Sequence, residues 1–170
     1  MTIRLKMMNA AAGAESSLGD SADLVRSFLY SRINSDGGFK GRTDASDLYY
    51  TVFGLEALLA LHADVPVKKI LNYLRQFDDI ESLDLIHLSC LVRGRTDLAA
   101  EPFTKDTIDK ILRLAENYYA RQNSIYSCFF TIGIYQDLNI ELPDRSAVIN
   151  RIDSLRTADS AYANDTAIKI

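Results

Sequence analysis

Three side chains with metal-ligand chemistry, Asp84, His87 and Cys90, follow one another at intervals of three residues. They lie in a mostly apolar stretch, 82–92, that we expect to be helical, so they would share a broad face. A displaced zinc site is one interpretation, since carboxylate, imidazole and thiolate all bind zinc. The other is a capping carboxylate, a hydrogen-bonded histidine and a buried apolar cysteine. We favour the second, because a metal would need a further ligand.

Arg42 follows a glycine-rich turn, Asp36-Gly37-Gly38-Phe39, and is the best candidate for binding an anion. Its planar guanidinium suits a diphosphate, because it can donate to two oxygens at once. The alternative, a salt bridge to Asp44 or Asp47, is favoured for an exposed arginine. An acidic segment, 78–81, lacks the last aspartate of a magnesium-diphosphate motif and is better explained by the positive end of a helix.

Composition describes an ordinary globular chain that fits one domain, 1–170, with 48% hydrophobic and 25% charged residues. The net charge of −4 argues against binding nucleic acid. The basic pairs at 68–69 and 93/95 are expected either at a solvated helix edge or as C-terminal charges favoured by the helix dipole. No apolar run approaches the length of a membrane span. The two cysteines have no Cys-x-x-Cys spacing and suit a reducing compartment, so we expect a cytoplasmic protein.

Seven segments have helical patterns, and none shows the alternation of a strand. Amphipathic segments alternate with more uniformly apolar ones, which predicts an all-α fold of antiparallel helix pairs, alternately outer and inner. Thr104 is expected to cap the fifth segment, and Gly94 to end the fourth. The segments are 21–32, 47–63, 66–77, 82–92, 104–121, 124–138 and 145–155.

Two short matches indicate that the helix pairs are divergent repeats. Tyr49-Tyr50-Thr51-Val52 aligns with Phe129-Phe130-Thr131-Ile132. The turn Asp36-Gly37-Gly38-Phe39 aligns with Asp159-Ser160-Ala161-Tyr162, so a further helix is expected after Tyr162.

The stretch from about residue 21 to 63 resembles the repeat of the α/α-toroid superfamily, through Asp-Gly-Gly-Phe-x-Gly-Arg and Asp-x-Tyr-Tyr-Thr-x-x-Gly-Leu at 36–55. The weaker repeats extend the resemblance over most of the chain. That superfamily contains the β subunits of protein prenyltransferases, with the geranylgeranyltransferase type the most similar, and the squalene/terpene cyclases. The resemblance implies a partial α/α toroid of about seven helices, whose inner helices line a funnel for an isoprenoid chain. It places Tyr49, Tyr50, Phe53, Phe129 and Phe130 on the inner layer, as an apolar wall or as core.

The chain departs from that family at its metal ligands. Asp47 matches a zinc-binding aspartate, but Tyr49 and Tyr50 stand where the repeats of the family have cysteine and histidine. We therefore expect no zinc or magnesium unless the missing ligands are supplied elsewhere. The acidic motif of the cyclases, Asp-x-Asp-Asp, is absent too.

Seven helices supply only part of a ring, which predicts a truncated or shortened toroid. The functional expectation is an isoprenoid-handling protein of the prenyltransferase or cyclase kind, whose site is incomplete in this chain alone. The alternative is a non-catalytic helical-repeat scaffold that binds a peptide or lipid on its concave face.

An incomplete ring would leave apolar residues of the last pair uncovered, among them Phe129, Phe130, Ile134 and Ile149. We expect this face to be covered in one of two ways. Either the chain forms a homodimer or binds a partner chain that completes the toroid, or residues 1–14 fold back as a cap.

Overall fold

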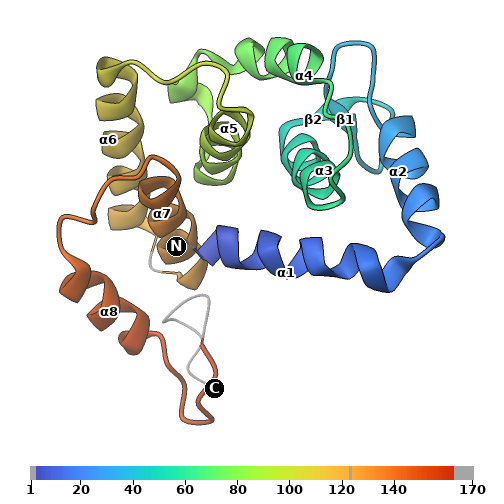
Figure 1. The fold of residues 1–170 in the computed structure, drawn as a ribbon. Helices are drawn as coiled ribbons and strands as arrows, with labels where there is room; N and C mark the ends of the chain where they lie inside the picture. Colours follow the sequence, from blue (N-terminus) through green and yellow to red (C-terminus); the bar gives the residue numbers. More distant parts are fainter. Residues whose placement is uncertain (1–2, 123, 163–170) are drawn as a thin grey trace.

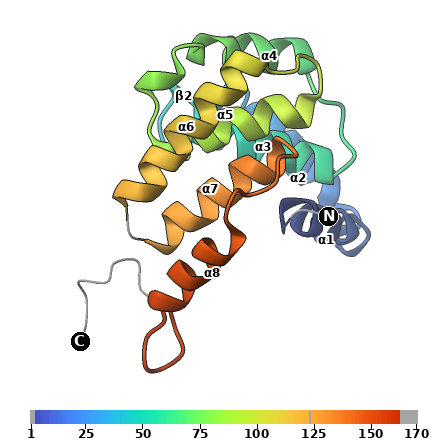
Figure 2. The ribbon, with the colours of Figure 1, turned by 90° about the vertical axis from the view of Figure 1, so that its left-hand side faces the viewer.

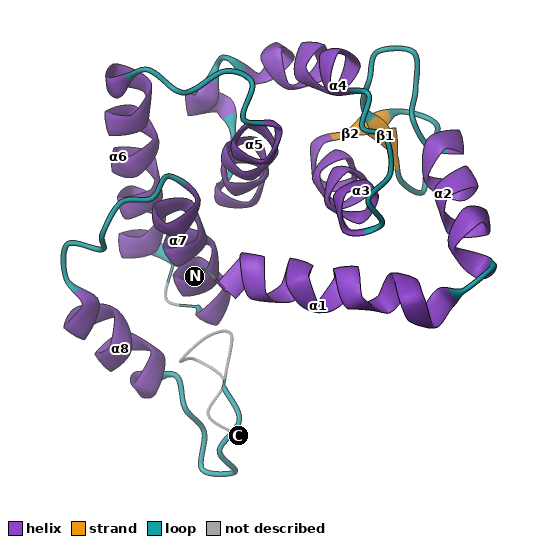
Figure 3. Ribbon diagram, in the orientation of Figure 1, coloured by secondary structure: helices purple, strands orange, loops and turns teal. Residues whose placement is uncertain are grey.

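The structure is a computed structural model that describes residues 3–122 and 124–162. Within these ranges the chain forms eight α-helices and one small antiparallel hairpin, so the predicted all-α class is confirmed (Figure 3). The helices are α1 (Ile3–Leu18), α2 (Ser21–Ser31), α3 (Leu48–Ala60), α4 (Val67–Leu74), α5 (Leu85–Leu98), α6 (Lys105–Arg121), α7 (Ile125–Asp137) and α8 (Arg145–Ser154). The strands are β1 (Phe39–Lys40) and β2 (Ser46–Asp47), and the 3-10 helices are η1 (Arg75–Phe77) and η2 (Ile80–Ser82).

The helices form an arc of two layers. The inner helices α3, α5 and α7 lie side by side, and α2, α4, α6 and α8 lie around the outside (Figures 1 and 2). Helix α1 runs across the open side of the arc and packs against α3 (Figure 1). The predicted alternation of outer and inner helices is therefore present, because the uniformly apolar helices are covered on more than one face.

The buried core lies mainly between the inner helices α3, α5 and α7, and between these and the outer helices α4 and α6. Its largest fully buried side chains are aliphatic, and most come from α3, α4 and α5. No helix in the described ranges is both long enough and apolar enough to cross a bilayer.

Helix ends agree with the sequence where a side chain caps them. The side chains of Asp47, Thr104 and Ser124 each accept a hydrogen bond from the backbone N–H three residues ahead, at the starts of α3, α6 and α7. The prediction that Gly94 ends this helix is wrong. Helix α5 continues through Gly94 to Leu98. The glycine has a packing reason instead: a Cβ there would approach side chains of α3 and α4 to 3.2 Å.

Helix α1 was not among the seven predicted helices, because its sequence lacks a clear apolar stripe. It nevertheless folds back over the inner layer, as one of our two predictions for residues 1–14 required; residues 1–2 lie outside the described ranges. Among the side chains of α1 whose burial is described, those of residues 6–13 and 16–18, none is fully buried, so this part of α1 covers the arc without entering its core.

The glycine turn joins three parts of the arc. Gly37 has φ +95°, and a Cβ there would lie 2.0 Å from the Lys69 carbonyl oxygen at the start of α4. The next aromatic residue, Phe39, is 3% exposed, and its N–H donates to the Thr51 hydroxyl at 2.8 Å. Its ring lies against Gly54, where a Cβ would be only 2.2 Å away. The turn thus locks α2, α3 and α4 together.

The predicted second copy of this turn has the same backbone bonds. In the first turn, Gly37 N–H donates to the Asn34 carbonyl at 3.1 Å. In the second, Ser160 N–H donates to the Thr157 carbonyl at 3.0 Å, and Ser160 has φ +68°. In both turns the leading aspartate side chain accepts from the N–H two residues on, at 3.0 and 3.2 Å. The helix expected after Tyr162 lies outside the described residues.

Candidate functional site

A cavity of about 260 Å³ lies between α1 and the three inner helices. Its apolar wall is mostly aromatic, with rings from the first turns and middle of α3 and α7. The five rings belong to Tyr49, Phe53, Tyr126, Phe129 and Phe130. Met7 and Met8 of α1 line the side toward that helix, and the cavity is partly open to solvent. An aromatic-walled space with a few polar groups is the usual form of a small-molecule site, although this one is small for its kind.

The rings of the wall contact one another within each helix. Tyr49 and Phe53 have ring centroids 4.6 Å apart, and Phe129 and Phe130 are 5.4 Å apart in an edge-to-face arrangement. Tyr126 stacks over Phe130 at 6.4 Å. Phe53 and Phe129 remain well exposed although they belong to inner helices. They therefore present apolar surface at the cavity that no other described residue covers fully.

One end of the cavity is charged. Arg93 of α5 lies between Glu56 of α3 and Asp137 of α7, with its Nε 3.7 Å from Glu56 Oε1 and 3.8 Å from Asp137 Oδ2. The three side chains are 12%, 14% and 2% exposed. All three belong to the C-terminal halves of their helices, where a buried cation offsets the negative ends of the helix dipoles.

Gly133 lies on the cavity wall in the middle of α7. A Cβ at this position would meet no heavy atom within 4 Å. A glycine inside a helix costs about 0.5–1 kcal/mol relative to alanine, and usually a close neighbour explains it, as at Gly54 and Gly94. No described neighbour explains Gly133. Its effect is to keep space open inside the cavity.

The structure brings together only part of the predicted site. Cys90 and the aromatic residues Tyr49, Phe53, Phe129 and Phe130 line the cavity, but Tyr50 does not. The Tyr50 ring faces a separate, shallower hollow of about 540 Å³ that also contains Arg42, and Phe53 separates the two spaces.

Arg42 is exposed at this separate hollow and, within the described ranges, forms no ion pair with either predicted partner. Asp44 instead lies 3.5 Å from Lys40. Asp47 accepts a hydrogen bond from the Tyr50 N–H at 3.0 Å and caps α3. The expected salt bridge of Arg42 is therefore absent from the described structure, and the anion-binding role of Arg42 stays a prediction.

The three metal-ligand side chains of α5 are not grouped. Asp84 caps the helix by accepting from the His87 N–H at 2.8 Å, and its carboxylate is 2.9 Å from His87 Nδ1. Cys90 lies further along α5, buried at the cavity wall. Among the described residues, no three His, Cys, Asp or Glu side chains come close enough to hold a metal ion. The capping role of Asp84 agrees with the structural interpretation.

Both cysteines are expected to react slowly with a thiol reagent in the native protein. Burial raises the pKa of the Cys90 thiol from 9.0 to about 12, and burial also raises the pKa of Cys128. At neutral pH the thiolate fraction of Cys90 should be about a thousandfold below that of a free cysteine, and the thiolate is the reactive form. Labelling with a chromogenic disulfide, with and without urea, measures this. Rapid native labelling of Cys90 would show that the cavity opens readily.

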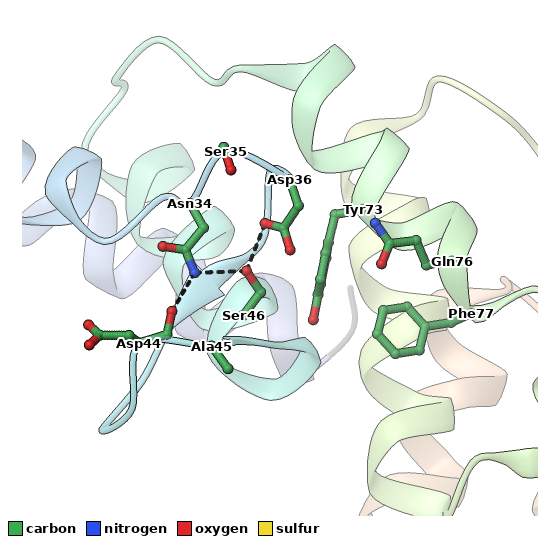
Figure 4. Close-up of a pocket in the computed structure, with 9 residues that line it drawn as sticks. All are labelled: Asn34, Ser35, Asp36, Asp44, Ala45, Ser46, Tyr73, Gln76 and Phe77. Carbon is green, nitrogen blue, oxygen red and sulfur yellow. Dashed lines mark hydrogen bonds between the residues drawn. The ribbon is translucent and has the colours of Figure 1, made fainter.

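A more open hollow of about 650 Å³ lies beside the glycine turn and contains two carboxylates, those of Asp36 and Asp44 (Figure 4). Its polar groups mainly hold the turn to the hairpin. Asp36 accepts from the Ser46 hydroxyl at 2.7 Å, and the Asn34 amide donates to the Asp44 carbonyl at 2.9 Å and to Ser46 at 3.0 Å (Figure 4). We therefore regard this hollow as structural.

The charged end of the cavity was missed from the sequence. Of the two positions expected for Arg93, the solvated helix edge is wrong, because α5 is flanked by α3 and α7 and the side chain lies between them. The other, a charge toward the C-terminal end of a helix, agrees with its place in α5. One feature of the sequence could have indicated that Glu56 and Arg93 lie close together. Glu56 and Arg93 both follow their capping aspartates, Asp47 and Asp84, by nine residues, which places them at equivalent points of neighbouring inner helices.

Comparison of the chain with known proteins finds no matching family model, no similar curated protein and no similar solved structure.

Proposed function

We propose that this protein binds an apolar, isoprenoid-type molecule in the cavity between α1, α3, α5 and α7. The observation that carries the proposal is the aromatic wall around Gly133, a helix glycine that no described neighbour explains and that keeps the space open. Aromatic and methionine side chains form an adaptable apolar surface for a branched hydrocarbon. The resemblance of residues 36–55 to the repeat of prenyltransferases and terpene cyclases points to the same ligand class.

The proposal is one of binding rather than of a complete reaction. The cavity contains the Cys90 thiol and one charged cluster, but no described group of metal ligands. An isoprenoid-handling enzyme whose site needs further residues, from a partner chain or elsewhere, is compatible with this arrangement. The expected homodimer also stays a prediction. Of the face on which it was based, Phe129 and Ile149 are exposed, but Ile134 is fully buried, so that part of the expectation is wrong. Leu24 and Phe28 on α2 are further exposed apolar residues.

The alternative is a non-catalytic scaffold that binds a peptide or lipid on its concave face, and its peptide form is less well supported. Helix α1 already lies across this face, and its Met7 and Met8 line the cavity. A peptide would have to displace α1, whereas a small apolar ligand fits beneath it. The contacts of α1 thus favour the small ligand.

Replacing Gly133 with leucine should abolish ligand binding while leaving the fold intact. The new side chain would project into the cavity without a clash at its Cβ, and glycine-to-leucine also favours the helix. Binding can be measured by the fluorescence of N-phenyl-1-naphthylamine, a neutral apolar probe, and its displacement by geraniol. We expect at least a tenfold loss of probe affinity and an unchanged or slightly higher urea midpoint.

Gly133→Ala is the matched control. It gives the same helix preference but fills little of the cavity, so it should gain up to about 1 kcal/mol of stability and keep the probe. If wild type binds no probe, or if the leucine variant binds it as well as wild type, the cavity is not the binding site.

A further inference from the structure

The charged end of the cavity has a hydrogen-bond requirement that an apolar chain alone does not meet. The Arg93 Nε–H is buried and has no hydrogen-bond partner among the described residues. The nearest carboxylate oxygens, Glu56 Oε1 and Asp137 Oδ2, are 3.7 and 3.8 Å away, beyond hydrogen-bond distance from Nε. A buried donor left in this state is costly, and the guanidinium faces the cavity.

The distances from Arg93 Nε to the nearest oxygens of Glu56 and Asp137 suit one ligand oxygen atom placed between them. An oxygen about 2.8 Å from Nε and about 2.8 Å from a carboxylate oxygen forms a triangle with the 3.7 Å or 3.8 Å separation as its base. Such an atom would accept from Arg93 and donate to Glu56 or Asp137. It must therefore be both an acceptor and a donor.

Common ligand head groups differ in whether they can both donate and accept a hydrogen bond, and this decides which of them fits the site. A hydroxyl donates one proton and accepts, whereas an ammonium only donates and a carboxylate only accepts. A carbonyl or an ether likewise cannot donate to the carboxylates. A charged head would also lose its hydration in this largely buried site, at a high cost.

We propose that the ligand is a neutral alcohol, with its apolar chain against the aromatic wall and its hydroxyl between Arg93, Glu56 and Asp137. The chain would run from the ring-lined end of the cavity toward the C-terminal ends of the inner helices. This inference rests on the proposed function, because it names the head group of the molecule that the same cavity binds. The class is that of isoprenoid or similar branched alcohols.

The test is a series of ligands with one tail and different heads. Geraniol, geranyl methyl ether, geranylamine and geranate are each used to displace N-phenyl-1-naphthylamine from the wild-type protein. The hydroxyl of geraniol can donate to a carboxylate and its methyl ether cannot. Because hydrogen bonds to charged groups are strong, we expect geraniol to displace the probe at about 10- to 100-fold lower concentration than the ether. Equal potency of the ether, or higher potency of the amine or the carboxylate, would overturn the assignment of an alcohol.

A variant of Arg93 tests the contribution of the ligand's head group separately from that of its apolar tail. In Arg93→Met the preference for geraniol over its ether should fall to within about threefold, because the hydroxyl loses its donor. The variant also loses the ion pairs to Glu56 and Asp137, so its urea midpoint is measured first and the preference is compared only in folded protein. A retained preference in a folded variant would contradict the role of Arg93. The wild-type series remains decisive if this variant does not fold.

The two proposals fail differently. If the probe does not bind, or binds without regard to Gly133→Leu, both are wrong. A second outcome is that the wild type binds the probe, Gly133→Leu does not, and all four ligands displace the probe equally. In that case the cavity binds apolar molecules and only the alcohol assignment is wrong.

Discussion

Replacing Gly37 with alanine is expected to lower the free energy of unfolding by about 2 to 5 kcal/mol, as measured by urea denaturation. Two costs add. The backbone at Gly37 has φ +95°, a region that costs an L-residue about 1–2 kcal/mol. The new Cβ would also lie 2.0 Å from the Lys69 carbonyl oxygen, and moving packed backbone costs about 1–3 kcal/mol.

Gly19→Ala is the control for this prediction. Gly19 also has a positive φ, +52°, but a Cβ there would meet nothing within 4 Å. It should cost no more than the backbone strain, at most about 1–2 kcal/mol. Equal losses in the two variants would show that the contact between the turn and α4 contributes nothing.

Phe39→Ala should cost about 3–5 kcal/mol, the range for removing a buried phenylalanine ring. The ring is almost fully buried, fills the space left by Gly54, and its backbone N–H is held by Thr51. Its loss would leave a cavity between the turn and α3 that rigid helix backbones cannot fill. The change is measured as a shift of the urea midpoint at unchanged slope.

The repeat supplies a matched control at the second turn. Tyr162 occupies the position equivalent to Phe39 but is 47% exposed. Tyr162→Ala should therefore cost less than about 1 kcal/mol, like other substitutions of exposed residues. A cost near that of Phe39→Ala would mean that Tyr162 is covered in solution, for example by a second copy of the chain.

The fold was largely predictable because its signals are local. The caps Asp47, Thr104 and Ser124 mark helix starts through bonds to residues three positions away, and the apolar pattern separates inner from outer helices. The glycine turn was predictable for the same reason, since its internal backbone bonds join residues 34–38.

The cavity was predictable only in part, because it depends on contacts between distant segments. The inner-layer position of Phe53, Phe129 and Phe130 followed from the helix pattern, but the lining by Met7 and Met8 depends on where α1 docks. The burial of Arg93 was not predicted for the same reason. A charged residue in an apolar helix is buried or exposed according to its neighbours, and the sequence of one helix does not contain them.

Helix α1 has a mechanical consequence for the arc. In an array of helix pairs, each pair contacts only the neighbouring pairs. Small rotations between pairs therefore add up, and the two ends of an open array can move toward or away from each other. Helix α1 lies across the open side of this array, where it packs against α3 and contacts α2 (Figure 1). A helix of 16 residues is about 24 Å long and resists both stretching and compression. We therefore expect α1, held against α3, to limit these rotations at the start of the arc.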